Sequence, residues 1–125
     1  MKSPAAGPLP KEAWQTQIGI EILQNMLKGT RPPSPMSRTL PHALIEVGPR
    51  RVVATGTPAK EFYNSMGVVH GGFAMTLIDS CTGWAVESTL KPGQGFTTIE
   101  TKVNFVRPLT ENSAPVRGFF FGARA

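Results

Sequence analysis

The sequence has few of the features that mark several common classes of protein. Its single cysteine among 125 residues cannot form an internal disulfide, which is typical of a reducing compartment. No apolar run approaches the ~20 residues that a membrane-spanning helix needs. The start, Met1-Lys2-Ser3-Pro4, lacks the apolar segment of a secretory signal. These absences predict a cytoplasmic protein that does not interact with membranes.

The residues needed for three kinds of functional site are also scarce. Two histidines far apart and one cysteine give no metal-ligand spacing, so we expect no metal site. No Gly-x-Ser-x-Gly elbow occurs, so a serine hydrolase is not supported. The net charge of +5 comes from scattered basic residues without interleaved aromatics, which argues against nucleic acid as a partner. The charge fits either an ordinary basic surface or an anionic ligand.

The most informative part of the sequence is an apolar-periodic segment over residues 72–88, which contains no proline and predicts a helix. One face of this helix is apolar and comprises Phe73, Ala74, Leu77, Cys81, Trp84 and Ala85, with Ile78 at its margin. The single acid, Asp79, lies on the other face among small and hydroxyl side chains.

A lone acid on a helix is most often a solvated surface residue. Here Lys and Glu are nearly absent from the helix, although a solvated face is normally richer in them. The helix is also entered by His70-Gly71-Gly72, which leaves backbone N–H groups uncovered at its positive end. Such an end can receive a developing oxyanion. These features favour a functional role for Asp79.

The remaining pattern predicts an α+β fold, an antiparallel sheet packed against one long helix. After a loose arm of residues 1–9, residues 10–28 predict one helix that ends at Gly29, and the proline-rich residues 30–41 an irregular connector. Predicted strands are residues 44–47 and 51–57 as a hairpin, 97–108 as the longest strand, and 116–121 as the fourth.

Two blocks of residues resemble a known family. The first is Asn-x-x-Gly-x-x-His-Gly-Gly followed by x-x-x-x-Leu-x-Asp-x-x-x-Gly-x-Ala, which runs from Asn64 to Ala85 and includes Asp79. It resembles the signature of the PaaI-like branch of hotdog-fold acyl-CoA thioesterases. The second block, residues 97–108, resembles the strand that follows the helix in that family. The resemblance covers roughly residues 40–117, and so many spaced positions make it specific.

The resemblance implies a hotdog domain over residues 40–125, in which an antiparallel sheet wraps around a central helix. Residues 1–39 would form an N-terminal arm, an extra helix and a connector. Similar proteins pair as homodimers, often as dimers of dimers (homotetramers), with active sites at the dimer interface. The implied substrate is an acyl-CoA, such as an aryl-acetyl thioester of phenylacetate degradation or a medium-chain thioester. Coenzyme A would be part of the substrate, so no separate cofactor is implied.

The resemblance also implies roles for individual residues. Asp79 would be the nucleophile or the general base for water, and the Gly71 N–H would polarise the thioester carbonyl. Asn64 and His70 would position the thioester or the departing thiolate, and Thr98 would hold the attacking water. The family's histidine-glycine segment and its acid come from different subunits. The further substrate-binding candidates, of which the last two would meet the phosphates of coenzyme A, are Gly72, Thr82, Asn104 and Arg107.

Without the resemblance, several of these residues have simpler interpretations. A histidine such as His70 is more often structural, and Thr98 would be an ordinary strand threonine. Cys81 lies on the apolar face, so it is predicted to be a buried, inert thiol. His42 follows a proline in a predicted loop and is interpreted as an unremarkable surface residue.

The C-terminal stretch departs from the family pattern. Family members continue for further strands after the Arg-Pro segment, whereas residues 118–125 contain three consecutive phenylalanines and do not alternate. We therefore expect a truncated or frame-shifted C-terminus. The alternative function is then a non-catalytic acyl-CoA-binding or interaction subunit of hotdog fold, inactive through that truncation. Hydratases of similar fold rank third, because their usual catalytic pair is not evident.

Overall fold

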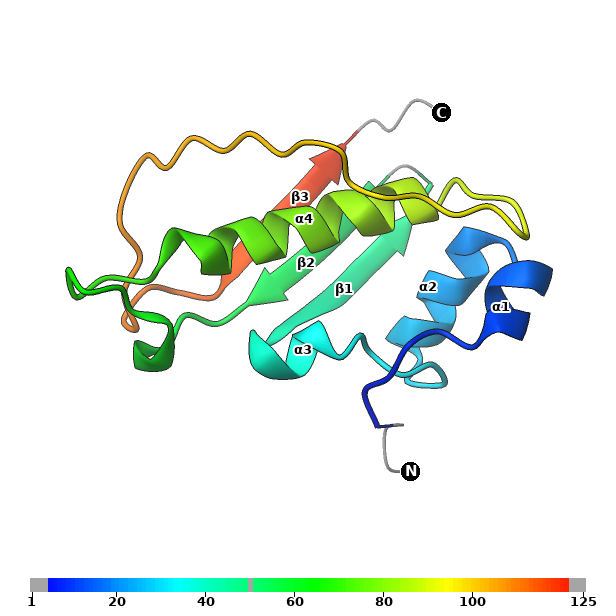
Figure 1. The fold of residues 1–125 in the computed structure, drawn as a ribbon, viewed down its shortest axis with the longest axis horizontal. Helices are drawn as coiled ribbons and strands as arrows, with labels where there is room; N and C mark the ends of the chain where they lie inside the picture. Colours follow the sequence, from blue (N-terminus) through cyan, green and yellow to red (C-terminus); the bar gives the residue numbers. More distant parts are fainter. Residues whose placement is uncertain (1–4, 50, 122–125) are drawn as a thin grey trace.

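A computed structural model describes residues 5–49 and 51–121 (Figure 1). Parts of the predicted arm (1–4) and of the predicted C-terminal departure (122–125) lie outside the described residues. The elements in chain order are α1 (Lys11–Thr16), α2 (Gly19–Leu27), α3 (Met36–Thr39), β1 (His42–Gly48), β2 (Arg51–Gly56), the 3-10 turn η1 (Lys60–Phe62), α4 (Gly71–Glu87) and β3 (Val116–Phe121). Within the described ranges, no helix is long and apolar enough to span a bilayer.

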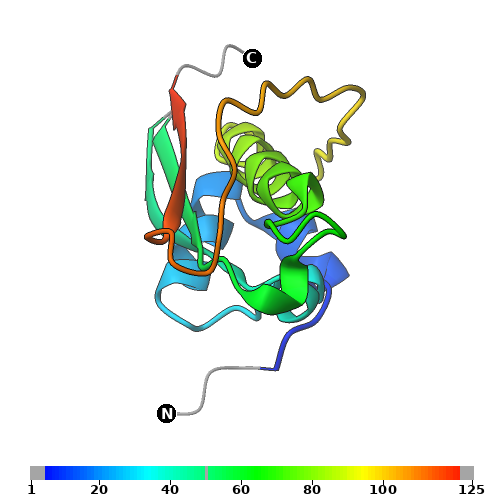
Figure 2. The same ribbon diagram turned by 90° about the vertical axis from the view of Figure 1, so that its left-hand side faces the viewer.

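The three strands form one antiparallel sheet in the order β1-β2-β3. The predicted hairpin and the predicted strand over 116–121 are confirmed. The long helix α4 lies across one face of the sheet, and the two layers are seen edge-on in Figure 2. Apolar residues from the sheet, α2 and α4 meet between the layers and form a buried cluster of Leu23, Leu44, Val52, Ala54, Leu77, Cys81 and Ala85. The structure is therefore α+β, as predicted.

Helix α4 agrees closely with its prediction. Its buried residues are Phe73, Leu77, Cys81 and Ala85, all from the predicted apolar face, and Asp79 lies on the exposed side. A glycine on β3 lets the helix approach the sheet closely, because a Cβ atom at Gly118 would lie 3.3 Å from the Cβ of Cys81. The predicted burial of the Cys81 thiol is confirmed, and this burial raises its pKa.

The single helix predicted over residues 10–28 is wrong, because the chain breaks it into α1 and α2 at residues 17–18. The cause is a contact with the far end of α4. The Gly19 N–H donates to the Leu90 carbonyl at 3.0 Å, and a Cβ on Gly19 would lie 1.6 Å from the Glu87 carbonyl oxygen. Trp14 and Ile18 remain 37% and 41% exposed. The proline-rich connector likewise contains one helical turn, α3, where no regular structure was expected.

The largest departure from prediction is residues 97–108, which form no strand. They run as an extended segment beside α4 and lead round to β3 (Figure 1). The Phe96 ring contacts Gly83 at one end, and the Phe105 ring contacts Gly71 near the other. Ile99 is 97% exposed. A strand requires a hydrogen-bonded neighbour, and the described residues provide none for this segment, so its alternation alone does not make it a strand.

Candidate active site

The loop that enters α4 is built around Asn64. Its side-chain oxygen accepts the N–H groups of Met66 at 2.9 Å and Val68 at 3.4 Å, and Gly67 takes a positive φ of 79°. Such a turn favours Asn at its start and Gly at the left-handed position. The side-chain oxygen of Asn64 is thus used to shape the loop, which leaves the amide nitrogen as the group that can meet a ligand.

Two consecutive backbone N–H groups at the start of α4 have different surroundings. The Gly72 N–H donates to Nδ1 of the N-cap residue His70 at 2.9 Å. The Gly71 N–H has no hydrogen-bond partner among the described residues. Helix N-terminal N–H groups carry partial positive charge, so the Gly71 N–H is a candidate donor to an oxyanion. Because Nδ1 of His70 accepts, the neutral ring carries its proton on Nε2, which is a second exposed donor.

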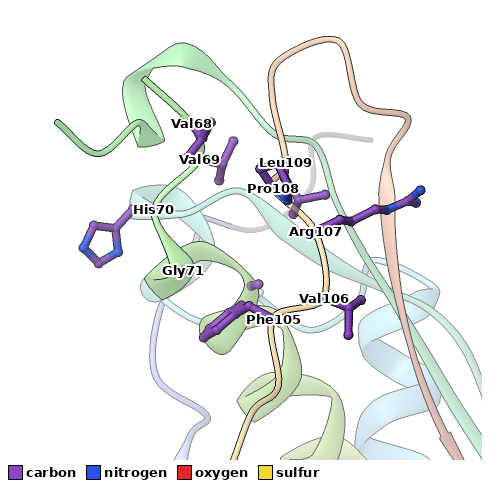
Figure 3. A pocket seen from close by; sticks show the side chains of 10 residues that line it. Val68, Val69, His70, Gly71, Phe105, Val106, Arg107, Pro108 and Leu109 are labelled. Atoms are coloured by element: carbon purple, nitrogen blue, oxygen red, sulfur yellow. The ribbon is translucent and has the colours of Figure 1, made fainter. Parts of the chain in front are cut away.

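Glycine is required at position 71 for a packing reason. A Cβ there would lie 3.0 Å from the Phe105 ring, which approaches the helix entrance from the extended segment. A cavity of about 540 Å³ lies beside this contact and is lined mainly by apolar residues of the loop and of residues 105–109. Figure 3 shows the His70 ring turned away from the cluster of Val69 and Leu109 that lines the cavity.

Asp79 and Thr98, nineteen positions apart (98 minus 79), are brought together by the extended segment. The Thr98 hydroxyl donates to Asp79 Oδ1 at 2.7 Å, and both residues are exposed. The carboxylate lines a cavity of about 380 Å³ on the solvent side of α4. Thr98, which the resemblance predicts to hold the attacking water, contacts the carboxylate directly within one chain, and its role stays a prediction. Its hydroxyl orients the carboxylate, and together they can bind a water molecule.

The predicted oxyanion donor and the predicted acid are far apart in one chain. They lie eight residues apart on α4 (79 minus 71), which is about 12 Å along the axis at 1.5 Å per residue. A carbonyl held at the Gly71 N–H is thus out of reach of Asp79 in the same chain. The single chain presents two half-sites, one at the entrance of α4 and one at its middle.

Of the predicted substrate-binding residues Arg107, Asn104 and Thr82, only Arg107 lines one of these cavities. Arg107 is exposed and lines the cavity beside Gly71 together with a second open cavity that also includes Arg117. Asn104 is exposed and lines none of these cavities. The Thr82 hydroxyl bonds back to the carbonyls of Ile78 and Asp79 at 3.0 Å each, a contact within the helix.

The interpretation of His42 as a surface residue is wrong, because its ring is 8% exposed. The residue begins β1 and faces α4, where Nε2 lies 2.9 Å from the Ser80 hydroxyl and Nδ1 contacts the Leu40 carbonyl. Ser80 follows Asp79 and lines the same cavity, yet neither member of the pair was singled out. The signal was present in the alternation of β1, which places His42 on the same buried face as Leu44.

A half-buried acid at the end of α4 was also missed. Burial raises the pKa of Glu87 from 4.5 to about 7, because removing a carboxylate from water disfavours its charged form. Metal binding finds no support in the described ranges, where no group of three or more His, Cys, Asp or Glu residues is placed to hold an ion.

Comparisons with known proteins find one family model and several solved structures that are similar to this chain. Residues 66–116 match the family model of the thioesterase superfamily. A solved structure of a phenylacetic acid degradation-related protein from Ralstonia eutropha is 24% identical, with a TM-score of 0.72 over 83% of this chain and 80% of that chain. No curated protein matches the sequence.

Two further solved structures are similar. A conserved protein from Pseudomonas aeruginosa is 26% identical, with a TM-score of 0.61 over 67% of this chain and 66% of that chain. A thioesterase family protein from Silicibacter pomeroyi is 24% identical, with a TM-score of 0.60 over 72% of this chain and 63% of that chain. The matched region holds both half-sites and the helix that carries them. Residues 66–116 therefore resemble the thioesterase superfamily, and the chain has the hotdog fold of these solved structures.

Proposed function

We propose that the protein is an acyl-CoA thioesterase of the PaaI-like branch. The match of residues 66–116 to the thioesterase superfamily supports a thioester hydrolase in general. The observation that carries the proposal is the direct Thr98–Asp79 hydrogen bond of 2.7 Å on the exposed face of α4. With the Gly71 N–H at the helix entrance, it supplies an activating carboxylate and an oxyanion donor, the two groups that thioester hydrolysis needs.

The chemistry requires little from the protein. A thioester carbonyl is electrophilic and a thiolate leaves readily, so one carboxylate can activate the reaction. Asp79 acts either as the nucleophile or as the general base for a water held with Thr98. In the second route the water proton passes to Asp79, and the departing thiolate finally takes a proton. An oxyanion donor such as the Gly71 N–H typically contributes ~3 kcal/mol in the transition state, and His70 Nε2–H supplies a second donor for the carbonyl or the sulfur.

The active site is proposed to form between two copies of the chain. The ~12 Å between Gly71 and Asp79 along one helix supports this arrangement, since neither half-site is complete alone. The extended segment offers the surface for pairing, because Ile99 and Val106 are 97% and 91% exposed and its backbone lacks a strand partner among the described residues. Large apolar side chains exposed on a backbone without a strand partner are features that a second copy would cover.

The substrate is proposed to be an acyl-CoA, with an aryl-acetyl thioester as one candidate class. The similarity to a phenylacetic acid degradation-related protein supports that class. Arg107 and Arg117 line one open cavity beyond the helix entrance and would pair with the phosphates of coenzyme A.

The test is thiol release from a panel of acyl-CoAs by the purified protein. We expect Asp79→Asn to lose about 100-fold or more of kcat. Glu12→Gln is the matched control, an acid-to-amide change on the exposed α1, and should keep the wild-type rate. Equal rates for wild type and Asp79→Asn would reject the catalytic assignment. Binding of acyl-CoA without turnover would identify a non-catalytic acyl-CoA-binding protein instead.

A further inference from the structure

The His42–Ser80 pair links the linings of two cavities. Ser80 lines the cavity of about 380 Å³ that contains the Asp79 carboxylate. His42 lines a second cavity of about 190 Å³, on the side of α2 and the connector. The two side chains join at 2.9 Å between Ser80 Oγ and His42 Nε2. The hydrogen-bonded pair, called the partition below, therefore lies where the linings of the two cavities meet.

The His42 imidazole is held in place by contacts at both of its nitrogens and by a neighbouring aromatic ring. Nδ1 contacts the Leu40 carbonyl, which only accepts, so the neutral ring carries its proton on Nδ1. Nε2 must then accept from the Ser80 hydroxyl. The ring also packs 5.9 Å from the Trp84 ring, measured between centroids. A buried imidazole bonded at both nitrogens and packed against an aromatic ring has little freedom to rotate away.

The cavity behind the partition is suited to an alkyl group. Its walls include Met26, Leu44 and Trp84, all at least half-buried. Arg31 also lines it, and its guanidinium is engaged by Gln17 Oε1 at 2.9 Å. A ligand that reached this cavity from Asp79 would have to displace the His42–Ser80 hydrogen bond.

We propose that the His42–Ser80 pair forms the floor of the acyl pocket and limits the length of the acyl group that the enzyme accepts. This inference rests on the proposed thioesterase function and names its substrate class. Because Ser80 and Asp79 line the same cavity, an acyl group whose carbonyl meets Asp79 there would extend toward the floor. Among linear acyl chains, the floor admits short groups such as acetyl and butanoyl and excludes octanoyl. The apolar cavity behind the floor becomes available to longer chains only when the floor is removed.

The first experiment compares kcat/KM for acetyl-, butanoyl-, hexanoyl- and octanoyl-CoA. We expect wild type to lose rate as the chain lengthens beyond butanoyl. His42→Ala should reverse this trend and gain about fourfold per additional methylene that enters the opened cavity. Ser80→Ala keeps the His42 ring but removes the hydrogen bond that holds it. This variant should therefore raise kcat/KM for the longer acyl groups as His42→Ala does, but by a smaller factor. The matched control Ser88→Ala removes a helix hydroxyl that bonds only to the Ala85 carbonyl at 2.7 Å, and its profile should equal that of wild type.

A second measurement does not depend on hydrolysis. Calorimetry gives the affinities of S-alkyl-CoA thioethers of the same lengths for wild type and the three variants. A length limit in wild type that is relaxed in His42→Ala or Ser80→Ala supports the floor. Identical length profiles in wild type and both variants overturn it, as does wild-type hydrolysis of octanoyl-CoA as fast as that of butanoyl-CoA. Absence of thiol release from every acyl-CoA rejects the proposed function, while the thioether affinities still decide the position of the floor.

Discussion

Two regions of this chain carry equally regular sequence patterns and have very different structures. Helix α4 repeats apolar residues at helical spacing and packs them against the sheet. Residues 97–108 alternate apolar and polar residues as a strand does, yet run as an extended segment with exposed side chains. A helix satisfies its backbone hydrogen bonds internally, whereas a strand needs a neighbouring chain segment. A periodic pattern therefore suffices to predict a helix, and predicts a strand only together with a partner.

The largest expected effect compares truncations in the two regions. Leu77→Ala removes a side chain that is 2% exposed in the core and should lower the free energy of unfolding by about 4 kcal/mol. Ile99→Ala removes a side chain that is 97% exposed and should change that free energy by less than about 0.5 kcal/mol in the monomer. Urea unfolding monitored by circular dichroism measures both. If Ile99→Ala costs as much as Leu77→Ala, the extended segment is packed in solution and the contrast disappears.

The next effect is the pH dependence of the free energy of unfolding that the half-buried Glu87 causes at the end of α4. Glu87 has its pKa raised by burial from 4.5 to about 7, so between these pH values the folded chain binds more protons than the unfolded chain. Stability contributed by the protonated group is complete below pH 4.5 and is lost as pH rises through about 7. The loss amounts to at most about 3 kcal/mol.

Glu87→Gln should remove this pH dependence and make the protein more stable than wild type above pH 7. Urea unfolding of wild type and variant between pH 5 and pH 8 provides the measurement. The exposed acid of α2 serves as control, and Glu21→Gln should leave the wild-type pH dependence in place. Parallel curves for wild type and Glu87→Gln would contradict the assignment.

The smallest effect concerns the hydrogen bond between Thr98 of the extended segment and Asp79 of α4. Thr98→Val keeps the side-chain shape and removes the hydroxyl that donates to Asp79 at 2.7 Å. We expect about a 10-fold lower kcat with little change in KM, since a hydrogen bond to a charged group contributes about 1.5 kcal/mol or more. Thr89→Val is the control, because its hydroxyl bonds only to the Val86 carbonyl at the end of α4. An unchanged kcat in Thr98→Val would show that the segment only covers the helix.

The elements that were predicted well are those with local signals. The helix over residues 71–87 and its buried face follow from apolar spacing and from the glycines at its entrance. The hairpin follows from two β-prone runs around a Gly-Pro turn. The errors have non-local causes, since the break at residues 17–18 depends on a contact with Glu87, which lies 68 positions beyond Gly19 (87 minus 19).

The site shows the same division. Asp79, Gly71 and His70 were predicted because they share one helix and its cap, where spacing along the chain gives spacing in space. Thr98 was a candidate only through the family resemblance, and its contact with Asp79 was not predicted, since nothing local brings the two together. The burial of His42 against Ser80 was missed because it depends on β1 packing against α4.

The amino-acid sequence by itself determined where the long helix begins and which of its faces is buried. These properties depend on helical geometry, which is complete within the segment that forms it. Only the tertiary structure decided that residues 97–108 lack a strand partner among the described residues, that α1 and α2 separate, and that His42 is held against Ser80 behind Asp79. Each of these depends on whether a distant part of the chain supplies a hydrogen-bond partner or occupies the space, and local pattern does not encode that.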